Sequence, residues 1–405
     1  MLISMSWRNI WRNKVRSLVV IFAIAIGLVG GIFITGLMTG MVAQQTDNTI
    51  NSDISNVQIH NPGFLENMNP KYLIDKVGDK VKEVESLAFV SEVCTRTKST
   101  AMASTAATGS GVTIFGIDPA QEKSVTDIHT KLIEGHYFEK ESKTAQIVIG
   151  QKLSNKLKAG VGKKIVITLQ SLDGEMTYAL FRVAGIFKTN DSRFDETNVF
   201  VRADNLNSSI GIGSDHANEI AIRTVNLDAS FIVADHLKTE YPGLSVQSWR
   251  DIKPSLIIMM TMMDQFSYLL MIIILFALIF GIINTMLMVI LERRRELGML
   301  MAVGMNKKRV FKMILIETIL LSLTGGAIGL VLSVALIQWL ARVGINFASW
   351  AEGLSAMGYS SYIYPIVTTE FYVTVTILVI ITAIIASIWP TRKAVKLNPA
   401  EAIRE

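Results

Sequence analysis

Cysteine and recognisable catalytic motifs are nearly missing from this sequence. Its 405 residues include one cysteine, Cys94, and five scattered histidines, which excludes an intrachain disulfide and disfavours a structural zinc site. The segment closest to a phosphate-binding loop, residues 160–164, lacks both the required spacing and the Ser or Thr that would hold Mg²⁺. We therefore expect a non-enzymatic chain with no metal or cofactor of its own.

Charged residues are absent from long stretches of the chain. Three stretches contain no Asp, Glu, Lys or Arg, and a fourth contains only Glu317 after its first residue. Each is long enough to cross a ~30 Å hydrocarbon core, which takes about 20 residues. The sequence therefore predicts an α-helical membrane protein with four transmembrane helices, at 18–43, 267–291, 312–341 and 371–389.

Lys and Arg are absent from residues 343–391, but they crowd the N-terminus, the 292–312 connection and the tail. The positive-inside rule then places both termini in the cytoplasm. The first apolar run is too long for a cleaved signal, so we expect it to remain as an anchor. The other predicted segments are a cytoplasmic start at 1–17, an outer domain at 44–266, a cytoplasmic connection at 292–311, an outer loop at 342–370 and a cytoplasmic tail at 390–405.

The net charge of +5 does not indicate nucleic-acid binding. Residues 44–265 hold 27 acidic and 23 basic residues, so the basic excess lies at the membrane borders, where topology and anionic lipid explain it. At the N-terminus, Ile3, Trp7, Ile10 and Trp11 share one helical face. This predicts an interfacial helix, and simple aromatic anchoring explains the same residues equally well.

The outer domain alternates predicted strands and helices. Two β-α-β units flank its middle, so we infer an α+β base built from both ends and an inserted β-rich lobe at 100–217. Asp173-Gly174 predicts a hairpin turn inside this lobe. The expected base elements are strands at 57–60, 88–97, 219–223 and 244–249 with helices at 70–87 and 227–240, and the expected lobe strands are 112–116, 147–149, 164–169, 178–187 and 199–202.

The 292–311 connection is the most informative segment. It continues the second span as a basic helix, Gly304 suits the left-handed position after a helix, and Asn306 suits the next N-cap. An apolar tip ringed by Arg and Lys fits a groove on a partner, and a solvated positive-inside loop is the alternative. The residues expected to be exposed at the tip are Leu297, Leu300, Met301 and Ala302.

This hairpin resembles the core of the FtsX-like permease family, the MacB or LolC/LolE type of ABC transporter. Further matching motifs lie at 7–16, 316–329 and 389–402, and those at 57–62 and 116–121 are similar to lipoprotein-releasing permeases. The resemblance implies that the hairpin docks on a cytoplasmic ABC ATPase, present in two copies, which would hold ATP and Mg²⁺. The expected coupling residues are Glu292, Arg295, Glu296, Leu297, Gly298, Leu300, Met301, Ala302 and Gly304, with Arg309 among the matching positions.

Small and polar residues inside the spans predict how the helices pack. Glycines four residues apart permit close helix approach, either within the chain or across a dimer interface. Asn284 is expected to bond to a neighbouring helix, and Glu317 to pair with a basic residue of the hairpin rather than carry protons. The glycines concerned are Gly27, Gly31, Gly36, Gly40, Gly325 and Gly329.

Methionines crowd the entry to the second span and recur at the same level on the first. Their adaptable thioether side chains would suit the acyl chains of a cargo entering between two subunits, and ordinary helix packing explains them too. The candidate acyl-chain residues are Met38, Met41, Met259, Met262, Met263 and Phe266.

Three functions remain open at this stage. The first is an inner-membrane permease that extracts lipoproteins and passes them to a periplasmic carrier, with a second permease copy or paralogue as partner. The second is MacB-like tripartite efflux of peptides, toxins or antibiotics through an adaptor. The third is FtsX-like mechanotransmission to a cell-wall hydrolase, for which the outer domain is large.

Overall fold

The computed structural model describes residues 2–12, 14–138, 144–213 and 215–395. The chain divides into two compact units. A helical unit contains residues 1–42, 260–346 and 362–405, and an α+β unit contains residues 43–259 and 347–361.

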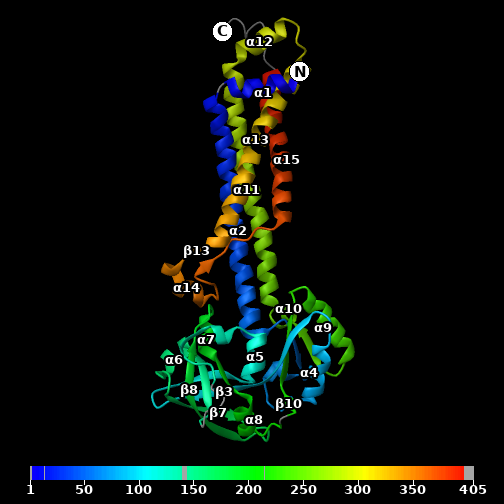
Figure 1. The fold of residues 1–405 in the computed structure, drawn as a ribbon. Coiled ribbons are helices and arrows are strands. Elements are labelled where there is room, and N and C mark those ends of the chain that lie inside the picture. Colours follow the sequence, from blue (N-terminus) through cyan, green and yellow to red (C-terminus); the bar gives the residue numbers. More distant parts are fainter. Residues whose placement is uncertain (1, 13, 139–143, 214, 396–405) are drawn as a thin grey trace. The chain divides into compact units, whose positions relative to one another are not determined.

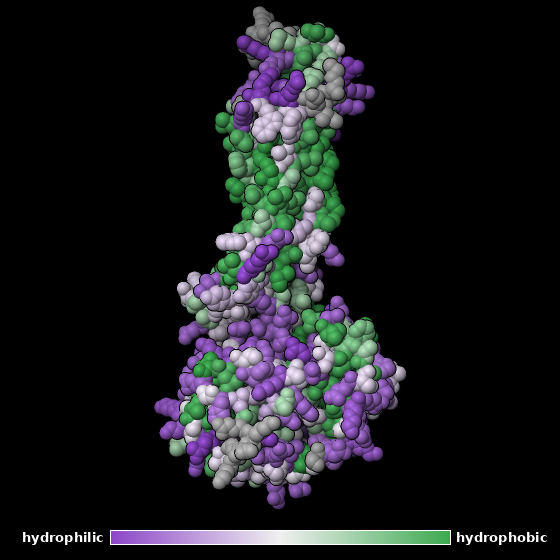
Figure 2. Space-filling model, viewed as in Figure 1, coloured by the Kyte–Doolittle hydropathy of each residue, from purple (hydrophilic) through white to green (hydrophobic). Residues whose placement is uncertain are grey.

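Four long helices form the helical unit in the described part of the chain, and all are long and apolar enough to cross a membrane. They contain the four predicted spans but extend beyond most of their ends. Figure 2 shows apolar side chains covering this bundle, with hydrophilic ones at the end where Figure 1 places α1 and α12. The helices are α1 (Leu2–Arg12), α2 (Lys14–Thr49), α11 (Pro254–Glu292), α12 (Arg294–Ala302), α13 (Lys307–Val343) and α15 (Thr369–Val395), with a short β13–β14 pair (Ile345–Asn346 and Tyr362–Ile363).

The predicted glycines pack helices together within this chain. A Cβ added to Gly325 would lie 3.0 Å from the Cβ of Ile24 on α2, and one added to Gly31 would lie 2.7 Å from Ile274 on α11. Gly27 also faces α11, Gly329 faces α2, and Gly36 and Gly40 face residues 364–367. Of the two alternatives from the sequence, packing within the subunit therefore accounts for all six.

The expected helix–helix partner of Asn284 is not found. Its side chain is exposed on α11 and makes no hydrogen bond with any described residue. The reason lies in helical spacing, because Phe280 and Met288, four residues to either side, are also exposed on this outward face. The prediction of an interhelical bond is wrong within this chain.

A mixed sheet of ten described strands runs through the α+β unit, in the order β12-β1-β11-β3-β4-β9-β6-β8-β5, with β7 pairing β3 and β8. The β4–β9 and β6–β8 pairs are parallel, and the other pairs are antiparallel. The strands are β1 (Val57–His60), β3 (Val90–Ser104), β4 (Gly109–Ile117), β5 (Leu132–Gly135), β6 (Gln146–Gly150), β7 (Lys164–Gln170), β8 (Met176–Phe187), β9 (Asn198–Arg202), β11 (Glu219–Thr224) and β12 (Ser245–Ser248).

Three larger hydrophobic cores pack on this sheet in the described part of the unit, and the long strand β3 contributes to two of them. One gathers Ile59, Val84 and Leu237 in the β-α-β units, a second gathers residues such as Ile147 and Phe181 in the lobe, and a third is rich in aromatic side chains such as Phe187 and Phe200. The helices are α3 (Phe64–Asn67), α4 (Val77–Glu85), α5 (Pro119–Val125), α6 (Gln151–Leu157), α7 (Ser192–Thr197), α8 (Ala203–Ile210), α9 (Ala229–Glu240), α10 (Trp249–Ile252) and α14 (Ala351–Ala356), with single turns η1 (Ile50–Ile54), η2 (Ile128–Thr130) and η3 (Ala348–Trp350).

The β-α-β units and the lobe strands are found where the sequence predicts them, and Gly174 closes the β7–β8 hairpin with a positive φ of 85°. The helix predicted at 70–87 is wrong at its start. Residues Ile74–Asp75 form β2, which pairs with β10 (His216–Ala217), and Lys76 adopts a left-handed φ of 52°. Because a helix cannot pass through that conformation, α4 begins only at Val77.

Candidate coupling site

The turn between α12 and α13 is fixed by backbone hydrogen bonds. Gly304 has a positive φ of 104°, the N–H of Met305 donates to Leu300 O at 2.9 Å, and the N–H of Gly304 donates to Met301 O at 3.2 Å. This pair of bonds is the Schellman arrangement that ends a helix at a glycine. Asn306 then caps α13 by accepting from the N–H of Lys308 at 3.1 Å. Both local predictions, for Gly304 and for Asn306, are confirmed.

The exposed tip differs from the predicted one. Leu297 and Gly298 are buried against the helical bundle, and Leu300 and Met301 are half-buried. Only Ala302 among the predicted tip residues is exposed, and the exposed large apolar side chains are Met299 at 52% and Val303 at 90%. The helix turns Leu297 inward because Leu297 and Met301, four residues apart, share the face that meets the bundle core.

A chain of ion pairs holds the hairpin to the rest of the helical unit. Arg293, in the break between α11 and α12, donates from Nη1 to Glu317 Oε1 of α13 at 3.2 Å and from Nε to Glu296 Oε2 at 3.1 Å. Glu296 also accepts from Arg12 Nη2 of α1 at 2.6 Å, and Arg16 of α2 pairs with Glu292. The predicted pairing of Glu317 with a hairpin residue is confirmed. We name Arg12, Glu296, Arg293 and Glu317 the hairpin clamp.

Helix α1 packs on the start of α13. The Ser6 hydroxyl donates to Met313 O at 3.2 Å, and Ile10 is buried in the bundle core. Trp7 and Trp11 remain exposed, with ring centroids 6.0 Å apart. The face predicted from the N-terminal sequence is therefore split, since Ile10 points into the protein and the indoles point away from it.

Neighbouring arginines favour the charged form of Glu296 in the clamp. The hydrogen bond from Arg12, and then that from Arg293, holds the pKa of Glu296 below its ordinary value despite partial burial. The Glu296 carboxylate is thus ionised at neutral pH. Arg295, another predicted coupling residue, is exposed on α12.

The predicted acyl-chain residues occupy mixed environments. Met38, Met41, Met259 and Met263 are half-buried, while Met262 and Phe266 are exposed. A cavity bounded by α2, α11 and the start of α15 is lined by other residues, mostly polar ones. Contact of these methionines with acyl chains stays a prediction.

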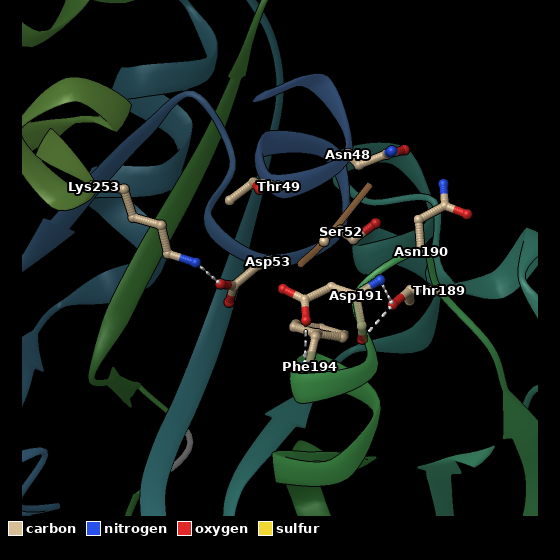
Figure 3. A pocket seen from close by; sticks show the side chains of 10 residues that line it. Asn48, Thr49, Ser52, Asp53, Thr189, Asn190, Asp191, Phe194 and Lys253 are labelled. Atoms are coloured by element: carbon tan, nitrogen blue, oxygen red, sulfur yellow. Dashed lines mark hydrogen bonds and ion pairs between the residues drawn. The ribbon is translucent and has the colours of Figure 1, made fainter. Parts of the chain in front are cut away.

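A polar joint lies in the α+β unit where the chain leaves α2 and where it enters α11. Figure 3 shows Lys253, just before α11, directed at the Asp53 carboxylate of η1, with an Nζ–Oδ2 distance of 2.7 Å. Asp191 beside it caps α7 through the N–H groups of Arg193 and Phe194. The pocket at this joint measures about 20 Å³, which is room for little more than one water at ~10–15 Å³. It is therefore a structural joint rather than a substrate site.

Sequence reasoning missed a buried charge cluster in the same unit. Arg96 of β3 donates to Glu122 of α5 at 2.8 and 3.0 Å, to Glu219 of β11 at 2.8 Å and to the Asp53 carbonyl of η1 at 3.3 Å. Glu219 also meets Lys98 at 2.5 Å and His60 at 2.9 Å. No spacing pattern in the sequence predicts these ion pairs, because their residues are far apart in the chain and meet only when the strands pair in the sheet. We name Arg96, Glu122, Glu219, Lys98 and His60 the buried cluster.

Four apolar helices with a basic hairpin between the second and third, joined to a large mixed α+β unit, define a multi-pass membrane protein of the permease class. The family of FtsX-like permease C-terminal domains matches residues 268–399, and that of MacB-like periplasmic core domains matches residues 17–238, more than half of the chain. The chain belongs to the FtsX-like, MacB-type family of ABC transporter permeases.

Named relatives match the chain to different extents. The macrolide export ATP-binding/permease protein MacB of Chlorobium luteolum is 36% identical over 31% of this chain, but the match takes in only 16% of that protein. The lipoprotein-releasing system transmembrane protein LolC of Xylella fastidiosa is 20% identical over 71% of this chain and 72% of its own length. The solved periplasmic region of MacB from Actinobacillus actinomycetemcomitans is 15% identical with a TM-score of 0.36, covering 52% of this chain and 97% of that one.

Proposed function

We propose that this chain is the membrane subunit of an ABC transporter that converts ATP-driven movement at the 292–311 hairpin into movement of its outer domain. A separate cytoplasmic ATPase, present in two copies, would supply ATP hydrolysis and hold ATP and Mg²⁺. A second copy or a paralogue of this chain would complete the complex in a bacterial inner membrane, with both termini in the cytoplasm.

The hairpin clamp is the observation that carries this proposal. It ties the hairpin to α1 through Arg12 and to α13 through Glu317, and Arg293 takes part in both connections. A force applied at the exposed tip would therefore reach α1, α11 and α13 together rather than bend a loose loop. Helices α2 and α11 each run unbroken from the helical unit into residues of the α+β unit, which provides a continuous path for such a movement.

For the cargo, we propose lipoproteins extracted from the inner membrane and passed to a periplasmic carrier. The support is the match to LolC, which extends over most of both chains. Efflux of peptides, toxins or antibiotics through an adaptor is the alternative, supported by the higher identity to MacB over a shorter segment. Mechanotransmission to a cell-wall hydrolase has no observation of its own in its favour.

The test substitutes Val303, the most exposed apolar side chain of the tip. Val303→Asp should abolish co-purification of the ATPase from native membranes and the ATP turnover that accompanies it, because a carboxylate would be buried in the partner's groove. Tyr178→Asp, at a position on β8 that is 72% exposed, is the control for an added surface carboxylate and should retain the ATPase. Retention of the ATPase by the Val303 variant, with normal insertion, would contradict the proposal.

A further inference from the structure

A polar pocket open to the surface lies in the helical unit between α2, α11 and the start of α15, and its two carboxylates, Asp264 and Glu370, are exposed. Its volume is about 130 Å³, roughly ten times the ~10–15 Å³ that one water requires. It therefore has room for a chemical group of several heavy atoms. The polar residues that line it are Thr35 and Thr39 of α2, Asp264 and Ser267 of α11, and Thr368 and Glu370 at the start of α15.

Two glycines of α2 allow this pocket to form. The N–H of Ile366 donates to Gly36 O at 2.9 Å, and a Cβ added to Gly40 would lie 2.2 Å from Tyr364 O. The segment before α15 therefore lies directly on the backbone of α2, an approach that a larger side chain would block. This close approach brings Thr368 and Glu370 next to Thr35.

Two hydroxyl groups in the pocket have no partner. Thr35 Oγ1 and Ser267 Oγ are buried and make no hydrogen bond with any residue that the structure describes, and their residues are only 4% and 3% exposed. Elsewhere in the helical unit, Thr318, Thr324 and Ser333 each donate to the carbonyl four residues earlier, as helical hydroxyls commonly do. Ser322 is a third buried hydroxyl without a partner among the described residues, but it stands alone, whereas Thr35 and Ser267 line one pocket. A buried hydroxyl without a partner costs about 1–3 kcal/mol, so this pair marks a place where a ligand would supply the missing contacts.

The pocket is acidic and lacks a countercharge. Asp264 and Glu370 form no ion pair with any residue that the structure describes. No Lys or Arg occurs in residues 17–70 or 254–292, nor in 343–391, and Arg342 at the end of α13 contacts neither carboxylate. An anion would be repelled here, whereas a cation would neutralise two carboxylates.

Aromatic rings and the oxygen groups together select the kind of cation. Tyr268 and Phe371 also line the pocket, with ring centroids 5.6 Å apart, and aromatic faces attract alkylammonium groups. The described residues contain no set of three or more His, Cys, Asp or Glu able to hold a metal ion. One turn along α11 from Tyr268, the side chain of Ile272 is exposed and apolar, which suits a hydrocarbon chain attached to the charged group.

We propose that this pocket binds the ammonium headgroup of a cationic amphiphile that reaches it from the lipid phase. The carboxylates of Asp264 and Glu370 neutralise the charge, and the hydroxyls of Thr35 and Ser267 contact the headgroup. Binding at this pocket does not require the ATPase, so it goes beyond the proposed function and is tested without nucleotide.

The experiment uses the full chain in nanodiscs of zwitterionic lipid, with empty nanodiscs subtracted. Decylammonium, decyl sulfate and decyl maltoside share a chain length and differ in headgroup charge, and the primary ammonium group can donate hydrogen bonds to the two hydroxyls. Calorimetric titration should show saturable binding of the cationic probe alone. The double variant Asp264→Asn/Glu370→Gln should weaken that binding at least tenfold, and Asp79→Asn/Glu85→Gln on exposed α4, with the same loss of charge, should not.

A second variant separates binding from folding. Thr35→Val keeps the side-chain shape and removes an unpaired hydroxyl, so it should leave Tm unchanged or higher while weakening the cationic probe several-fold. Equal binding of the sulfate probe, equal weakening in the α4 control, or an unchanged affinity in the Thr35 variant would overturn the proposal. Saturable binding of Ca²⁺ or Na⁺ without binding of the ammonium probe would also overturn it, in favour of an inorganic cation site.

Discussion

The hairpin clamp and the buried cluster use the same side-chain chemistry in opposite surroundings. In the outer pair of the clamp, the Arg12 and Glu296 side chains are 56% and 41% exposed, whereas those of its inner pair, Arg293 and Glu317, are 15% and 7% exposed. In the buried cluster, Arg96, Glu122 and Glu219 are at most 1% exposed. An exposed pair can exchange its partner for water at small cost, whereas separating a fully buried pair leaves an uncompensated charge in a low-dielectric interior.

This difference assigns different mechanical roles to the two regions. The buried cluster connects β1, β3, β11, α5 and η1 through hydrogen bonds in the interior of the α+β unit, so it holds these elements together. The clamp joins α1, α12 and α13 by contacts that are partly open to solvent. A transmission device needs both, a part that holds its shape and a part that releases and re-forms.

The largest expected effect comes from Arg96→Met, which removes the central cation of the buried cluster and tests whether that cluster holds the α+β unit together. It leaves Glu122 buried without a cation and Glu219 with only Lys98 and His60 as partners, which should destabilise the α+β unit by about 3–5 kcal/mol. Cys94, the chain's one cysteine, reports the change, because burial raises its pKa well above the ordinary value and protects it from alkylation. Native-state maleimide labelling should accelerate by at least 100-fold.

The control for this prediction is Lys156→Met. It removes an equally short ion pair, from Lys156 Nζ to Glu196 at 2.5 Å, in which both side chains are more than two-fifths exposed. Labelling of Cys94 should barely change. Loss of the nearby Arg96 charge would by itself raise the pKa of Cys94 and slow its reaction, so acceleration reports opening of the unit. Equal rates of Cys94 labelling in the Arg96 and Lys156 variants would show that the buried ion pairs stabilise the unit no more than the exposed pair does.

Asp195 tests the effect of burial without an ion pair. It is a buried carboxyl with no ion pair among the described residues, unlike the carboxylates of the buried cluster. Burial raises its pKa to about 6, against the opposing effect of hydrogen bonds from Thr189. The folded state therefore binds this proton more tightly than the unfolded state, and stability should fall as pH rises from about 4 to 6. Asp195→Asn should lose this slope and gain up to about 3 kcal/mol over wild type above pH 6.

Thermal unfolding of the purified full chain between pH 4.5 and 7.5 measures this effect as the difference between variant and wild type. Asp173→Asn, on the β7–β8 turn, removes a carboxyl from an exposed position and should keep the wild-type profile. Parallel pH profiles for Asp195→Asn and wild type would show that burial alone does not perturb a carboxyl in this unit.

Sequence reasoning succeeded where one short segment determines the outcome. Gly304 and Asn306 were predictable because a helix end needs a left-handed residue and the next helix needs a cap, both within a few residues. The pairing of Glu317 was predictable because it is the only charge inside its span and the hairpin supplies nearby cations. The motif at 398–402 that also contributed to the resemblance lies outside the described residues.

The failures share a different cause, which is contact between distant segments. Leu297 was predicted to be exposed because its burial depends on the bundle core that it meets, not on its neighbours in sequence. Asn284 was assigned a partner because polarity in a span suggests one, and the face on which it lies follows only from the packing of α11. The buried cluster brings together residues up to 159 positions apart in the sequence. Hydrophobic periodicity reports on neighbouring residues only, so it cannot predict such contacts.

The smallest expected change in stability comes from a substitution in the hairpin clamp. Glu296→Gln removes a charge that Arg12 and Arg293 share, but the pair is exposed enough that stability should fall by only about 1 kcal/mol or less. The pKa of Glu296 is lowered in the folded state, so its contribution is present at neutral pH and is lost as pH falls through that lowered value. Raising NaCl from 50 to 500 mM should remove most of the difference in Tm, because salt screens exposed charges. A salt-independent loss as large as that of Arg96→Met would mean that the clamp is as rigid as the buried cluster, and a hairpin fixed that firmly could not release during an ATPase cycle.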